Sequence, residues 1–145
     1  MERGFWAEGR NSCEDSAGQL ESGGDIQANL AAIDRFAAQA ARDGAALVAF
    51  PEYATYEKKE VDATFPQVAE PLDGPVCREL AAIARRHRIA PVTGVVEASE
   101  EPGKAYNTLA AFGSDGGPLA SYREDPPFRR AGVWGVRVHQ AGRVP

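Results

Sequence analysis

The chain has 145 residues, of which 43% are hydrophobic and 26% are charged, and its formal net charge is −5. This length suits one domain with a core of its own, and the acidic balance argues against nucleic acid as the main partner. No apolar run approaches the roughly 20 residues of a membrane-spanning helix. The first residues also lack the apolar core of a signal peptide, so we expect a cytoplasmic protein with no membrane partner.

Cysteine and histidine are scarce in this chain, which contains only Cys13, Cys77, His87 and His139. These residues make no disulfide framework and no spacing typical of a metal site. Unpaired cysteines are typical of a reducing compartment. We therefore expect an intracellular protein that holds neither a metal nor another cofactor.

The N-terminal part of the sequence divides into a leader and a helix. Residues 1–17 mix charges, glycine and two aromatic residues without a period of 2 or 3.6, which predicts a loose leader. Asp25 then suits a helix N-cap, and apolar residues recur behind it at helical spacing until Gly44, a C-terminal stop. We predict a helix over about 26–43 whose apolar face covers the strand that follows.

The next segment is an uninterrupted apolar run, residues 45–50, that ends at Pro51. Such a run is typical of a strand buried on both faces, and proline ends it because it cannot donate a ladder hydrogen bond. Glu52 therefore follows the carboxyl end of a buried strand, where ligands bind in open α/β sheets. Desolvation there would raise its pKa towards that of a general base. A carboxylate that caps the next turn, or that pairs with Lys58 or Lys59, is the alternative.

Residues 53–68 predict an irregular loop or short helix over the mouth of the sheet, where loops shape pockets, with a plain solvated connection as the alternative. The turn at 71–75 begins a second helix, apolar on one face and arginine-rich on the other. Cys77 lies near its start, where a thiol pKa can fall. No base is within local reach, so we interpret Cys77 as structural rather than nucleophilic, and His87 likewise.

Three further strands are predicted, over residues 89–96 (with Glu97 directly after it), 106–112 and 119–122. A hairpin loop of glycines and small polar residues joins the last two. The order helix, strand, helix and three strands predicts an α/β domain with helices layered over a sheet. Residues 124–145, with the Pro126-Pro127 pair and scattered arginines, predict a basic and poorly ordered tail; a nucleic-acid arm is a weak alternative.

Several motifs occur in one order: a Gln-loop-Asp start with Asn29 on the helix, Gly44–Glu52, the Gly74-Pro75 helix, Gly94–Glu97, Tyr106–Leu109, Asp115-Gly116 and Ser121–Arg123. Together they resemble the N-terminal half of the carbon–nitrogen hydrolase (nitrilase) superfamily over Gln19–Arg123. The resemblance implies a partial, truncated αββα sandwich that pairs sheet to sheet in a homodimer or higher homo-oligomer.

The resemblance also implies an ancestral activity, the hydrolysis of non-peptide C–N bonds in small amides, nitriles or carbamoyl amines. In a Glu-Lys-Cys triad the cysteine attacks the carbon, the glutamate is the base and the lysine stabilises the tetrahedral intermediate. Glu52 falls on the position of the catalytic glutamate. The expected ligand is therefore a small-molecule amide or nitrile.

The chain departs from this pattern in three places. Glu124 stands where the resemblance places the lysine, directly after Tyr122–Arg123. Neither Cys13 nor Cys77 has the context of the nucleophile, and the first strand is missing. Without the lysine and the cysteine the covalent route is closed, so the chain as written is expected to be inactive. The alternative is a non-catalytic partner subunit of a full-length relative.

A shifted reading frame accounts for two of these departures. Read one base later, codons for residues 124–133 permit Lys-Ile-His-Leu-Phe-Asp-Ala-Leu-Gly, which continues the family pattern. Codons for residues 13–17 likewise permit Val-(Lys or Arg)-Ile-Ala-Leu, a first strand. We hypothesise frame-shifted ends around a half-domain: a leader at 1–17, the hydrolase half at 18–123 and an aberrant tail at 124–145. Uncovered apolar faces would then make the isolated chain marginally stable or prone to aggregate.

Overall fold

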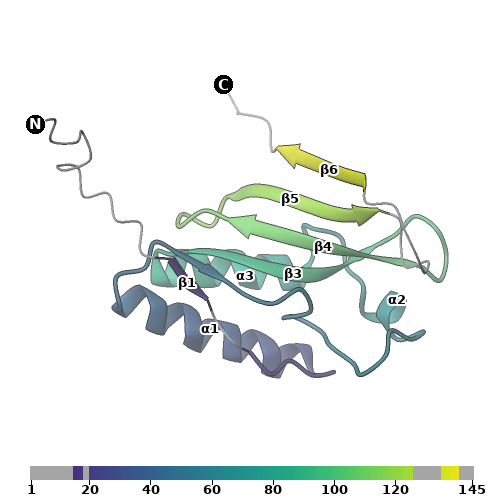
Figure 1. Ribbon diagram of the computed structural model, residues 1–145, viewed down its shortest axis with the longest axis horizontal. Coiled ribbons are helices and arrows are strands. Elements are labelled where there is room, and N and C mark those ends of the chain that lie inside the picture. Colours follow the sequence, from purple (N-terminus) through teal and green to yellow (C-terminus); the bar gives the residue numbers. More distant parts are fainter. Residues whose placement is uncertain (1–14, 18–19, 126–134, 141–145) are drawn as a thin grey trace, which may run out of the picture.

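The computed structural model describes residues 15–17, 20–125 and 135–140, which form one six-stranded sheet with helices against it (Figure 1). The strands follow chain order across the sheet. Neighbours are parallel from β1 to β3 and antiparallel from β3 to β6. The strands are β1 (Asp15–Ala17), β2 (Leu47–Ala49), β3 (Ala90–Ala98), β4 (Ala105–Phe112), β5 (Pro118–Asp125) and β6 (Gly135–Gln140).

Two long helices, α1 (Ile26–Arg42) and α3 (Pro75–His87), lie side by side on the same face of the sheet (Figure 1). The Asp25 side chain accepts hydrogen bonds from two backbone N–H groups in the first turn of α1, which confirms the predicted N-cap. A third helix, α2 (Phe65–Val68), is a single turn within the predicted loop over the sheet. The predicted α/β layering, with helices over a sheet, is confirmed.

The core lies between these helices and the sheet. Ile33 of α1 and both Leu80 and Ile83 of α3 are completely buried, and Val48 of β2 is nearly so. Full burial of a side chain of this size contributes about 1.5–3 kcal/mol. The apolar stripes at helical spacing therefore hold both long helices on one face of the sheet.

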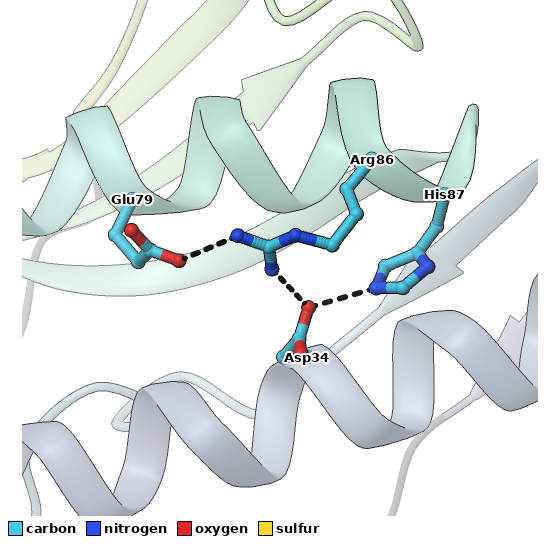
Figure 2. Close-up of polar contacts among 4 residues, drawn as sticks. All are labelled: Asp34, Glu79, Arg86 and His87. Carbon is cyan, nitrogen blue, oxygen red and sulfur yellow. Dashed lines mark hydrogen bonds and ion pairs between the residues drawn. The ribbon is translucent and has the colours of Figure 1, made fainter.

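A polar cluster joins the two helices at their outer edge (Figure 2). Asp34 of α1 accepts a hydrogen bond from Arg86 at 2.6 Å and lies 2.7 Å from His87 Nε2. Burial alone would raise the pKa of Asp34, but hydrogen bonds from His87 and Arg86 outweigh it and lower the pKa. Arg86 also reaches Glu79 at 3.4 Å. His87 thus links two helices, in agreement with its predicted structural role.

The two ends of the chain differ from prediction. Residues 15–17 of the expected loose leader form β1, which pairs in parallel with β2, so a first strand is present. At the other end Glu124 and Asp125 extend β5, and residues 135–140 form β6 beside it. The prediction of a leader and a tail without order was wrong for these residues. β1 and β6 are held at the edges of the sheet by pairing between backbone groups. Such strands need no side-chain periodicity, so the sequence pattern did not reveal them.

Candidate functional site

The backbone brings Glu52 to the carboxyl end of β2, as the sequence predicts. Phe50 N–H still donates to the Val92 carbonyl of β3, at 2.8 Å, and the strand then stops at Pro51. Ala54 N–H donates back to the Pro51 carbonyl at 3.2 Å and closes a turn. Glu52 lies within this turn, directly after the parallel part of the sheet.

The backbone of the Glu52 turn packs directly against Gly94 of β3. A Cβ built on Gly94 would lie 1.3 Å from the carbonyl oxygen of Glu52, so no larger residue fits beneath the turn. The Thr55 hydroxyl donates to the Gly94 carbonyl at 2.9 Å. The backbone of the Glu52 turn is therefore pressed directly against β3.

Asn29 of α1 holds the far end of the same turn. Its side chain is buried and donates to the carbonyls of Thr55, at 3.0 Å, and Gly23, at 2.7 Å. Its carbonyl oxygen accepts from Gly23 N–H at 3.0 Å. One amide thus ties the helix start and the loop after Glu52 together.

The carboxylate of Glu52 meets Asn107 of β4. The Asn107 side-chain amide donates to Glu52 Oε1 and lies 3.3 Å from Glu124 Oε2, so it bridges two carboxylates. A pocket of about 200 Å³ surrounds them, and it is lined by Glu52, Gly94, Asn107, Leu109, Tyr122 and Glu124. The residues that the resemblance places at the glutamate and lysine positions therefore face each other.

Glu52 is exposed, which corrects the expectation of a desolvated carboxylate. The physical reason is its position beside Asn107 and the 38% exposed Leu109, on the face of the sheet opposite the buried side chain of Thr108. The alternative pairing with Lys58 is not what the structure contains, since Lys58 Nζ lies 3.8 Å from Asp62 instead.

Tyr53, the residue after Glu52, connects the candidate site to the loop that contains α2. Its ring packs edge-on against Phe65 of α2 with the centroids 6.0 Å apart, and Tyr56 contacts the same ring at 5.0 Å. Partial burial and the nearby charges of Glu52 and Glu124 raise the pKa of the Tyr53 phenol. The phenol therefore stays protonated and able to donate a hydrogen bond.

Cys77 lies away from this pocket, buried in α3 as part of the core. Burial, with the charges of Glu70 and Glu97, raises the pKa of the Cys77 thiol to about 11. A thiol with that pKa stays protonated near neutral pH, which agrees with its interpretation as structural. Cys13 lies outside the described residues.

A partly buried ion pair between Glu97 and Arg123, which the sequence did not reveal, joins β3 to β5. Glu97 is 6% exposed and accepts from Thr108, at 2.5 Å, and from Arg123 Nε, at 3.0 Å. The Arg123 guanidinium also lies 4.1 Å from the centroid of the Tyr106 ring. Because successive strand side chains point to opposite faces, this contact directs Glu124 to the face that carries Glu52. The available signal in the sequence was the position of Glu97, a carboxylate directly after the predicted buried strand 89–96.

Within the described ranges, no group of three or more histidine, cysteine, aspartate or glutamate side chains is arranged to hold a metal ion. No helix among the same residues is long and apolar enough to cross a bilayer.

Similarity to known proteins shows the family of this chain. The family described as carbon–nitrogen hydrolase matches residues 16–142, nearly the whole chain. The chain belongs to the carbon–nitrogen hydrolase family. This match extends beyond Gln19–Arg123 on both sides, so it includes Glu124 and β6.

This carbon–nitrogen hydrolase chain is similar to a hydrolase of Mycobacterium tuberculosis, strain H37Rv, with 36% identity over 129 residues that cover 88% of the chain and 45% of the relative. It is also similar to the omega-amidase NIT2 of Homo sapiens, with 34% identity over 66% of the chain and 34% of the relative. The crystal structure of an amidase from Nesterenkonia sp. superposes with a TM-score of 0.65 at 26% identity, over 79% of this chain and 43% of that one. The chain thus spans less than half the length of these relatives.

Proposed function

We propose that Glu52 occupies the general-base position of a site whose ancestral reaction is the hydrolysis of non-peptide C–N bonds in small amides, nitriles or carbamoyl amines. The observation that carries this proposal is the meeting of Glu52 and Glu124 at Asn107. These two residues occupy the base and lysine positions of the family pattern. They are far apart in the sequence, and the fold brings them to one pocket.

The exposed position of Glu52 suits a base that serves a thiol from elsewhere. A carboxylate on the open face of the sheet can accept the proton of a cysteine brought over that face. Mutants of the similar Nesterenkonia amidase are in complex with acrylamide and with butyramide in two solved structures. In another structure, a further mutant of that amidase carries the acetamide moiety of fluoroacetamide at its active-site cysteine. These ligands support a small amide as the substrate.

The described residues do not complete the triad, and we propose that the chain as written has no turnover. A negative Glu124 in place of a lysine would repel the oxyanion that develops on the substrate, whereas catalysis needs a positive group there. The Cys77 thiol is buried and protonated, so it offers no nucleophile to Glu52.

Ammonia release from butyramide tests this function. We expect none from the 145-residue chain. We expect release from a chimera in which residues 1–123 are followed by the part of the Mycobacterium tuberculosis hydrolase that continues beyond the matching position. Substantial release by the chain alone would overturn the inactivity, and an inactive but folded chimera would overturn the proposed role of this half.

A partner-subunit role is the second candidate, and the open face of the sheet favours it. Leu109 is 38% exposed there, beside the pocket that holds Glu52. We propose that this face packs on a full-length relative if the chain acts without turnover. Size-exclusion chromatography of the chain with and without the Mycobacterium tuberculosis hydrolase separates the two functions, because only a partner subunit shifts to a shared peak.

A further inference from the structure

A second pocket lies beside the one that holds Glu52, between the α2 segment and the hairpin that joins β3 to β4. Its volume is about 200 Å³, and most of its lining is apolar or aromatic, contributed mainly by Tyr53, Val61, Phe65, Pro66, Val96 and Tyr106. We propose that this pocket binds the uncharged apolar group of the substrate, of phenyl or branched-alkyl size. This inference rests on the proposed function and names the substrate class.

Two residues connect the apolar pocket to the candidate base. Asn107 lines both pockets and donates its amide hydrogen bond to Glu52. Tyr53, the next residue after Glu52, forms part of the apolar wall. A ligand whose apolar end fills this pocket therefore presents its amide or nitrile end beside Asn107 and Glu52.

The size of the pocket sets the size of the group that it takes. An apolar protein cavity of roughly 150 Å³ holds benzene, so about 200 Å³ accommodates a phenyl ring or a branched alkyl chain. The walls are already packed against each other, because Phe65 contacts both Tyr53 and Tyr56 edge-on. The Tyr56 hydroxyl is hydrogen-bonded to Thr64 at 2.6 Å. Such a preformed pocket binds without the cost of ordering its lining.

The charges at the rim select a neutral group. Asp62 accepts a hydrogen bond from Thr64 N–H at 2.8 Å and lies 3.8 Å from Lys58. Lys104 is hydrogen-bonded to Glu101. Both charged residues that line the pocket are thus already paired. A ligand carboxylate would lose its hydration there without gaining a counter-ion, which is unfavourable.

Burial of each methylene strengthens binding about fourfold, so the benzyl group of phenylacetamide is expected to strengthen binding at least tenfold over the methyl group of acetamide. The test is a titration of the ¹⁵N-labelled 145-residue chain, followed by NMR, with phenylacetamide, acetamide and phenylacetate. We expect phenylacetamide to bind at least tenfold more tightly than the other two. We also expect it to shift the backbone amide signals of Ala105 and Tyr106. Equal affinities, or shifts confined to α1, would overturn the proposal.

A matched pair of variants sharpens the test. Val61 lines the pocket and is 46% exposed, whereas Leu119 is 56% exposed and does not line it. Val61→Asp should weaken phenylacetamide binding at least tenfold, and Leu119→Asp should leave it unchanged; equal effects would contradict the assignment. The binding of phenylacetamide needs no proton transfer. Failure of the pocket is therefore distinguishable from failure of Glu52 as a base, which is measured by ammonia release.

Discussion

Replacement of Gly94 by alanine should destabilise the fold and displace the candidate base at the same time. The new Cβ would lie 1.3 Å from the Glu52 carbonyl oxygen, whereas ordinary contacts begin at 3.4 Å. The Glu52 turn must therefore lift by about 2 Å. Overpacking of this kind costs about 1–3 kcal/mol, and the lifted turn also strains the bond from Thr55 to the Gly94 carbonyl, worth about 1 kcal/mol.

We therefore expect Gly94→Ala to lower the free energy of unfolding by about 3 kcal/mol, measured by urea unfolding followed by circular dichroism. If the wild-type chain is only marginally stable, the variant will be unfolded in buffer. Gly23→Ala is the matched control, because a Cβ there meets nothing within 4 Å. It should change stability by less than about 0.5 kcal/mol. Equal midpoints for the two variants would refute the close approach of Glu52 to β3.

Three other substitutions test contacts around the site and between the helices. Asn29→Ala leaves the Thr55 carbonyl without its donor and should cost about 1–3 kcal/mol in urea unfolding. Asp34→Asn should cost about 0.5 kcal/mol at neutral pH, since the cluster is partly exposed. Because the folded chain lowers the Asp34 pKa, the contribution of Asp34 is present above the ordinary value of 3.8 and lost as pH falls through the folded value. The gap between the urea midpoints of wild type and variant should therefore narrow as the pH falls below 3.8, and a gap that stays constant would contradict the assignment. Glu97→Gln weakens the charge-assisted bonds from Arg123 and should lower the thermal midpoint far more than the same change at exposed Glu101.

The sequence predicted those parts of the fold that side-chain periodicity controls. Apolar residues at helical spacing predicted 26–43 as a helix, and α1 spans Ile26–Arg42. The apolar run before Pro51 likewise located β2 and the turn that carries Glu52. Strands β1 and β6 escaped prediction because backbone pairing at the sheet edges holds them, and such pairing leaves no side-chain pattern.

The candidate site was predictable in position but not in its surroundings. A strand end followed by a carboxylate located Glu52, whereas its exposure depends on which face of the sheet the helices cover. The bridge through Asn107 and the ion pair of Glu97 with Arg123 depend on the register of β3, β4 and β5. No local pattern specifies that register. The frame-shift hypothesis for the two ends stays a prediction, and resequencing the locus beside codon 124 tests it.

The most direct measurement of the central claim is the rate of butyramide hydrolysis by the chimera with and without its candidate base. If Glu52 accepts the proton of the cysteine, Glu52→Gln should lower kcat/KM by about 10²–10⁴-fold. Glu57→Gln, at an exposed position five residues further along the same loop, should leave it within about twofold of the parent. Comparable rates for the parent chimera and the Glu52→Gln variant would show that this carboxylate is not the base.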